Sequence, residues 1–357
     1  MPDTEASLYP LRLRPRLEDK IWGARGLRPF FEDREDSAPA LGEAWLTYEQ
    51  AVVENGPLAG LTLGALMERF GPRLLGDAYR QRQHKRVSAD PALARDEAPA
   101  PYFPLLTKLL FTSDVLSVQV HPPDSWALEH AGGPGKTEMW YVIDAEPDSK
   151  VALGLTRELS REELAEAART GEIEQHLNWV KVRTGDVVFV PAGLLHTLGS
   201  GLKVCEIQQN SDLTYRFWDF NRPGPDGKPR ALHIDEGALV TDGAPWAGGS
   251  LPLVLESEDL DRRLLAACPY FAVEALEWSE SLTFRTDRDR FLILVILEGA
   301  GTLAGEEYVP GTIFLIPAHA EGFEVEPSAP TEAVCAYEPK LDALRKALER
   351  AGAAEHM

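Results

Sequence analysis

Short apolar runs, separated by glycine and proline, recur along most of the chain after residue 104. They are rich in Val, Ile and Leu, and such runs are typical of β-strands in a sandwich or barrel. The first set of predicted strands spans 115–120, 139–143, 151–155, 187–190, 202–207 and 215–220. The second set spans 270–275, 291–297, 301–304, 312–316, 322–325 and 333–337. The sequence therefore predicts a mainly β protein.

Helical patterns are fewer. Leu61–Leu75 places Leu and Met at helical spacing, with a break at Gly71-Pro72. Ser160–His176 opens with Ser followed three residues later by Glu, a capping box, and predicts one helix or two short ones inserted among the strands. The tail from Lys340 predicts a short amphipathic helix. Residues 78–101 are polar and rich in Pro and Ala, and predict an exposed loop or partly helical insert.

The two sets of strands resemble a loose repeat. Gly185–Pro191 and Gly311–Pro317 each consist of a glycine, five residues with an apolar core, and a proline. Prolines and glycines cluster in 222–250, which predicts a linker. We therefore predict two domains, residues 1–240 with an N-terminal helical segment, and residues 241–357 with a C-terminal helix.

Composition narrows the function. The chain has 36 Lys and Arg against 57 Asp and Glu, a net charge of −21, which disfavours nucleic acid as a partner. An anionic ligand would need a local cluster of Lys and Arg. No apolar stretch approaches the roughly 18 residues of a membrane span, and the acidic N-terminus lacks the apolar core of a secretory signal. Three scattered cysteines without zinc-finger spacing are typical of a reducing compartment, so a cytoplasmic protein is expected.

Three segments of the first half carry candidate metal ligands. Gln119 and His121 are two residues apart, so a strand would place both side chains on one face. Glu138 begins an apolar strand, and His196 follows a Pro/Gly turn. Taken singly, a His beside apolar residues is usually structural and a Glu at a strand start is usually solvated. Gln119, flanked by Val, needs a buried polar partner or a ligand. Together the four suit zinc or another borderline divalent ion with positions open to substrate.

The motifs carry a family resemblance. The pattern Gly185-x5-Pro191-x-Gly193-x2-His196 resembles the second conserved motif of the cupin superfamily. More narrowly, the chain resembles the type I mannose-6-phosphate isomerases of the compact bacterial form, over about residues 10–240 and more loosely beyond. The segments that carry this resemblance are LSVQVHP, GKTEMWYV, VPAGLLHTLGSGL, EIQQNSDLTYRFWDFNR and GKPRALHID.

The resemblance implies two cupin-type β-sandwich (jelly-roll) domains with short helical inserts, and one Zn²⁺ per chain. It also implies a zinc-dependent isomerase that interconverts mannose 6-phosphate and fructose 6-phosphate through an enediol intermediate, with an essential arginine at Arg216. The implied zinc ligands are Gln119, His121, Glu138 and His196. The general cupin motif has His-x-His where this chain has Gln, and the family more often has Lys-Pro-Glu where this chain has Lys136-Thr137-Glu138.

Further basic and acidic residues are candidates for the reaction. Lys136 shares a strand face with Glu138, so it could hold phosphate, polarise the substrate, or act as a base if its pKa were depressed; a solvated lysine is the alternative. Asp212 could orient Arg216, and Arg222 and Arg230 are candidate anion contacts. We therefore predict Arg216, Lys136 and Asp212 as catalytic, and Lys136, Arg216 and Arg222 as substrate-binding.

Other functions remain open at this point. The same fold could serve a non-catalytic sugar-phosphate-binding protein or an isomerase for a related sugar. An iron dioxygenase usually has a His-rich set, and Gln119 argues against it. The second repeat has Gly322 where the first has His196, so the second domain is predicted to be metal-free and His319 to be structural. The proton-transferring base and the oligomeric state are left open.

Overall fold

The computed structural model describes residues 7–76, 103–224, 226–246, 253–255, 260–340 and 346. The predicted insert at 78–101 lies outside the described residues, and so does the predicted C-terminal helix except for Lys340 and Lys346. Within the described residues, no helix is both long and apolar enough to span a bilayer.

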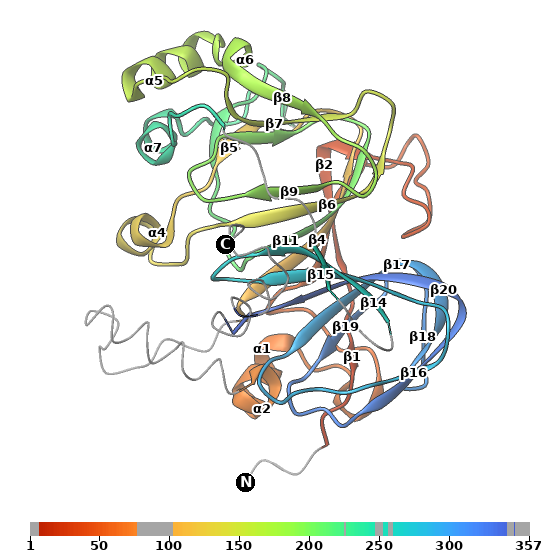
Figure 1. Ribbon diagram of the computed structural model, residues 1–357. Coiled ribbons are helices and arrows are strands. Elements are labelled where there is room, and N and C mark those ends of the chain that lie inside the picture. Colours follow the sequence, from red (N-terminus) through yellow and green to blue (C-terminus); the bar gives the residue numbers. More distant parts are fainter. Residues whose placement is uncertain are drawn as a thin grey trace.

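Two antiparallel sheets, six-stranded and five-stranded, make up the upper half of the molecule in Figure 1. The six-stranded sheet has the order β2 (Arg16–Ala24), β3 (Leu41–Thr47), β4 (Leu105–Thr112), β11 (Leu202–Gln209), β6 (Glu138–Ala145) and β9 (Val187–Val190). The five-stranded sheet has the order β12 (Tyr215–Trp218), β5 (Val118–Val120), β10 (His196–Leu198), β7 (Lys150–Leu155) and β8 (Leu177–Lys181).

A nine-stranded sheet forms the lower right of Figure 1 and curls around an apolar cluster of its own. Its main path is β1 (Leu11–Arg12), β19 (Ile313–Ile316), β17 (Leu292–Leu303), β20 (Phe323–Tyr337), β15 (Ala272–Trp278), β14 (Asp261–Ala267) and β13 (Leu253–Leu255). Two short strands, β16 (Leu282–Phe284) and β18 (Glu306–Tyr308), pair with β20 and β17. The N-terminal strand β1 joins this sheet, since Leu11 is opposite Leu315.

The described residues form seven helices, of which the last three pack against one face of the five-stranded sheet. They are η1 (Gly56–Leu58), α1 (Leu63–Phe70), α2 (Pro72–Leu75), α4 (Asp124–His130), α5 (Arg161–Thr170), α6 (Ile173–His176) and α7 (Ile234–Val240). The predicted break at Gly71 and the capping box of Ser160 and Glu163 are both confirmed. Helix α7 lies within residues 222–250, the predicted linker. Its residue Ala238 is buried against the five-stranded sheet.

The alternation of side chains along each strand creates the layers. On β6, Met139 and Tyr141 face the nine-stranded sheet, whereas Trp140 and Val142 face the five-stranded sheet. Side chains alternate in the same way along β11, where that of Cys205 faces the nine-stranded sheet. The central strands β4, β11 and β6 are therefore buried on both faces. Polar side chains on these strands, such as those of Glu138 and Glu206, are enclosed in the protein.

The prediction of a mainly β protein with antiparallel sandwich sheets is confirmed, but individual strands differ from the prediction. The strands predicted at 291–297 and 301–304 are one strand, β17, and those at 322–325 and 333–337 are one strand, β20. Register shifts between β17 and β20 accommodate the irregular residues, so the two strands stay paired along their length. Strands β2, β3 and β4 were not predicted.

The predicted repeat has the same local backbone in both copies. Gly185 and Gly311 both have a φ of +87°, and each leads through a turn into a four-residue strand, β9 or β19. Glycine accepts this left-handed conformation without steric cost, which explains why the motif begins with it.

Candidate metal centre and active site

Three buried side chains meet between the five- and six-stranded sheets. His121 follows β5, Glu138 begins β6 and His196 begins β10, and each is at most 1% exposed. His196 Nε2 lies 3.2 Å from Glu138 Oε1, and His121 Nε2 lies 3.6 Å from Glu138 Oε2. Their potential ligand atoms all lie within 4.8 Å of one another. The three segments singled out in the sequence therefore converge at one point.

Both imidazoles are oriented by backbone carbonyls. The Nδ1 atom of His196 lies 2.8 Å from the carbonyl oxygen of Leu194, and Nδ1 of His121 lies 3.1 Å from that of Leu213. A proton on each Nδ1 leaves Nε2 as a lone-pair donor directed at Glu138. Both Nε2 atoms are buried and have no hydrogen-bond partner within the described residues.

The electrostatics of this cluster favour neutral imidazole. Burial, followed by the positive charge of Lys136, lowers the pKa of His121 to about 3. Burial by itself would raise the pKa of Glu138, but Lys136 and the histidines hold it well below its ordinary value. Two imidazoles and one carboxylate, with two buried nitrogens lacking partners among the described residues, form a donor set that fits zinc or another borderline divalent ion.

Gln119 lies beside this cluster. It is half-buried on β5 and is directly opposite His196 on one side and Arg216 on the other. Facing residues of an antiparallel pair project to the same side of the sheet, so its side chain emerges next to that of His196. The structure therefore brings all four predicted ligands to one region. The role of Gln119 as a ligand stays a prediction.

Lys136 is buried rather than solvated. Its side chain is 5% exposed, and Nζ lies 2.7 Å from Glu138 Oε2 and 4.0 Å from Glu206 Oε1. Burial lowers its pKa, but the carboxylates of Glu138, Glu206 and Asp212 outweigh burial and raise it overall. Lys136 is therefore protonated in this environment. The alternative of a lysine base with a depressed pKa is not supported.

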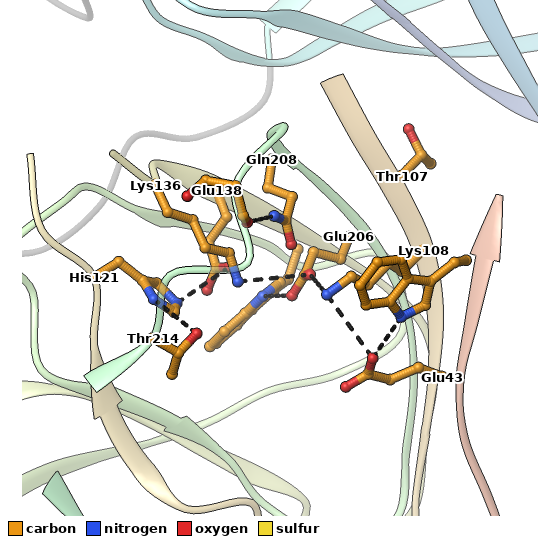
Figure 2. Close-up of polar contacts among 12 residues, drawn as sticks. Glu43, Thr107, Lys108, His121, Lys136, Glu138, Glu206, Gln208 and Thr214 are labelled. Carbon is orange, nitrogen blue, oxygen red and sulfur yellow. Dashed lines mark hydrogen bonds and ion pairs between the residues drawn. The ribbon is translucent and has the colours of Figure 1, made fainter. Parts of the chain in front are cut away.

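A row of buried charges continues from Lys136 across the six-stranded sheet, as Figure 2 shows. Glu206 of β11 lies opposite Lys108 of β4, with 3.6 Å between Oε1 and Nζ. Lys108 Nζ lies 3.9 Å from Glu43 Oε2 on β3. Trp140 donates from Nε1 to Glu206 Oε2 at 3.0 Å. The sequence reasoning missed this row, although Lys108 in the apolar run LLTKLLFT is a detectable signal.

The pKa values of Glu206 and Glu43 are shifted in opposite directions, because the two carboxylates have different neighbours. Burial raises the pKa of Glu206, and Lys136 and Lys108 only partly counteract it. For Glu43 the order is reversed, because the effects of Lys108, Lys20 and the Trp45 hydrogen bond exceed that of burial and lower its pKa.

Arg216 occupies the strand beside the cluster. Thr214, just before β12, places Oγ1 3.4 Å from Nδ1 of His121. The half-buried Arg216 donates from Nη1 to the carbonyl oxygen of Ala231 at 3.1 Å. Its Nε is buried and has no hydrogen-bond partner within the described residues. Burial and the charge of Arg230 lower its pKa slightly from that of a free guanidinium, which leaves it charged.

The predicted pairing of Asp212 with Arg216 is not found among the contacts of the described residues. Asp212 is exposed, and its charge acts on Lys136. The carboxylate that acts on Arg216 is instead that of Asp219. Sequence proximity suggested Asp212, but the turn before β12 directs it to solvent.

The other candidate anion contacts, Arg222 and Arg230, hold Asp219. Arg230 donates to both carboxylate oxygens at 2.6 and 2.7 Å, and Arg222 donates from Nη2 at 2.8 Å. Arg222 also donates from Nη1 to Asp114 at 3.1 Å and to the carbonyl of Val115. Because these guanidinium groups are engaged by protein acceptors, contact of Arg222 with a substrate stays a prediction.

The sandwich sheets with a buried His/Glu/His cluster define a cupin-type protein with a candidate metal centre. The chain is 33% identical to the mannose-6-phosphate isomerase of Streptococcus mutans, over 84% of this chain and 89% of the relative. It is 33% identical to the mannose-6-phosphate isomerase ManA of Bacillus subtilis, over 89% of this chain and 96% of the relative.

Solved structures give the same result. The crystal structure of the mannose 6-phosphate isomerase from Bacillus subtilis superposes with a TM-score of 0.76 at 30% identity, and covers 93% of this chain and all of that chain. No protein-family model matches the chain. On the strength of the curated relatives, the chain belongs to the mannose-6-phosphate isomerase family.

Proposed function

We propose that this protein is a zinc-dependent aldose–ketose isomerase that interconverts mannose 6-phosphate and fructose 6-phosphate. The observation that carries the proposal is the buried cluster of His121, Glu138 and His196, with both imidazole Nε2 atoms lacking partners within the described residues. Family membership supplies the reaction, since the relatives are named mannose-6-phosphate isomerases. The proposed zinc ligands are these three residues and Gln119.

The reaction transfers a proton between C1 and C2 of the sugar through an enediol. A bound divalent ion supplies positive charge that stabilises the negative charge developing on the sugar oxygens as the C–H bond breaks. The protein residues prepare this environment. Leu194 and Leu213 fix the two imidazoles through their carbonyl oxygens, and the ion pair with Lys136 orients Glu138.

The cations beside the cluster have separate proposed roles. Lys136 is fixed, buried and protonated, so it supplies positive charge that water cannot screen. Arg216 is half-buried beside Gln119, and its Nε has no partner within the described residues, so its guanidinium is proposed to bind the enediolate. Asp212 acts on this set only through the charge of Lys136.

The metal site is tested by measuring activity and metal content on one preparation. A coupled assay follows fructose 6-phosphate formation from mannose 6-phosphate, and elemental analysis gives zinc per chain. We expect His196→Ala to lose zinc and activity together, and His176→Ala, a change on α6, to keep both. A chelator should abolish the activity of the unmodified protein and added Zn²⁺ should restore it. Full activity in a metal-free sample would contradict the proposal.

The role of Arg216 needs a variant that keeps the metal. Arg216→Ala should retain zinc and lose turnover by roughly 100-fold or more, the usual effect of removing one group that stabilises developing charge. Arg183→Ala, at an exposed position, is the matched control and should behave as the unmodified protein. Near-normal turnover of Arg216→Ala would refute the catalytic role. Saturable binding of mannose 6-phosphate without any turnover by the unmodified protein would favour a binding protein instead.

A further inference from the structure

A cavity lies at one end of the nine-stranded sheet, away from the residues assigned to the reaction. It has a volume of about 270 Å³ and is lined by described residues of β14 to β17, the loop before β17, and the end of β20. The strands of the curled sheet that line it, β14 to β17 and β20, are labelled in Figure 1. Ligand sites occur preferentially in the mouths of β-barrels, because the strands hold the side chains of the rim rigidly.

The lining of this cavity contains a buried carboxylate, that of Glu274. The interior of the sheet is apolar, with residues such as Ile296 and Phe314 fully buried. At the cavity, however, Glu274 is only 2% exposed. Arg262 donates from Nε and Nη2 to Glu274 Oε2 at 2.9 and 2.6 Å, and Tyr337 donates to Oε1 at 2.5 Å.

Only the carboxylate of this ion pair is buried, because the side chain of Arg262 is 34% exposed and that of Glu274 is 2% exposed. Here the carboxylate is held by Arg262 and Tyr337, so it fixes both side chains in place. The triad therefore forms a rigid polar wall whose arginine still faces the cavity.

Two further arginines line the same cavity. Arg290 stacks over the ring of Tyr337, with Cζ 4.1 Å from the ring centroid, and its Nε lies 3.3 Å from Asp287 Oδ2. Arg285 is exposed at the rim. The three arginines exceed the lining carboxylates of Glu274 and Asp287 by one positive charge. In a chain with a net charge of −21, this is a local excess of positive charge.

The cavity also has an apolar lining. It consists of Leu276, Leu282, Leu292 and Phe284, and Phe284 is held by stacking on Phe323 with 5.4 Å between ring centroids. An inorganic ion would leave these side chains exposed to water. An occupant that satisfies both kinds of lining has an anionic group for the arginines and an apolar body.

We propose that this cavity binds a small organic anion, a phosphate monoester or a carboxylate, through Arg262, Arg285 and Arg290, with its apolar body against Leu276, Leu292 and Phe284. The site is separate from the metal cluster, which lies between the other two sheets. It is independent of the proposed reaction, because none of its residues belongs to the cluster or to the row of charges beside it.

Phenyl phosphate is a suitable probe, because it combines a dianionic phosphate with one apolar ring. Titration calorimetry is done on the zinc-loaded full chain. We expect one site per chain with a Kd below about 1 mM. Arg285→Ala, which removes a rim charge, and Leu282→Trp, which fills the cavity, should each weaken binding at least tenfold.

Arg288→Ala is the matched control, since Arg288 is exposed on the same loop and does not line the cavity. It should leave the affinity unchanged. Isomerase activity should be normal in all three variants, which also reports that they are folded; if Leu282→Trp fails this check, Arg285→Glu replaces it. Absence of binding up to millimolar probe, or equal affinity in the Arg285 and Arg288 variants, would each overturn the proposal.

Discussion

Asp219 supports the arginines around the active-site strand, and Asp219→Asn should destabilise the protein strongly. The carboxylate is 4% exposed and receives three hydrogen bonds of 2.6–2.8 Å from Arg222 and Arg230. Asparagine keeps the size but removes the charge and turns an NH₂ group toward guanidinium donors. Removal of one partner from a buried ion pair costs about 3–5 kcal/mol. Because both arginine side chains keep partial contact with water, we expect about 3 kcal/mol at pH 7.

The matched control is Asp235→Asn. Asp235 also accepts from an arginine at 2.6 Å, that of Arg169, but its side chain is 81% exposed. An exposed pair contributes about 0–1 kcal/mol, so this change should have a small effect on the free energy of unfolding. Urea unfolding of the two variants and the unmodified protein measures the difference. Equal destabilisation by both substitutions would refute the argument from burial.

The effect of Asp219→Asn should also depend on pH. Burial raises the pKa of Asp219, but hydrogen bonds and charge from Arg230 and Arg222 outweigh it and hold the pKa below its ordinary value of 3.8. A depressed folded-state pKa gives stability that is complete above the unfolded-state value and is lost as pH falls through the folded-state value. The gap between the unmodified protein and the variant should therefore be constant near neutrality and narrow below about pH 4. A gap that widens in acid would contradict this.

Three further changes test the surroundings of the site. Gln209→Leu removes the amide that accepts from the backbone N–H of Thr137 at 2.8 Å, so it should weaken metal binding about tenfold in a chelator competition. Tyr141→Phe removes a 2.7 Å hydrogen bond to Glu332 between two sheets, and should cost about 1–2 kcal/mol in urea unfolding. Lys108→Met leaves buried carboxylates without their cation and should cost about 3 kcal/mol; adding Glu206→Gln to it should cost less than the sum of the single changes.

The sequence predicted the local parts of the site well. His121, Glu138 and His196 lie at the ends of short apolar strands and Gln119 lies within one, and strand period and turn residues are local signals. Gln119 and His121 share a face because they are two residues apart, and the glycine–proline frame around β9 positions the turn before His196. The helix after Ser160 could also be predicted from the sequence, because its capping box lies within four residues.

Contacts between segments that are distant in sequence could not be predicted from local patterns. The pairing of β1 with β19 joins segments about 300 residues apart, and no local pattern specifies it. Asp212 appeared to be the partner of Arg216 because it is close in sequence, whereas tertiary structure brings Asp219. The long strands β17 and β20 were divided in the prediction, because their irregular residues are tolerated only by a register that the partner strand defines.

The row of buried charges shows what a single sequence can and cannot contribute. A lysine inside LLTKLLFT indicates that some buried anion must exist, since an unpaired buried ammonium is too costly to persist. Which anion it meets depends on register, and here Glu206 of β11 is directly opposite Lys108. Two buried lysines of this row (Lys108 and Lys136) face three glutamates (Glu43, Glu138 and Glu206), and the part-exposed Lys20 balances the third glutamate. The row therefore supplies no excess positive charge, and we propose that the positive charge for a sugar phosphate in so acidic a chain comes from Arg216 together with the proposed metal ion.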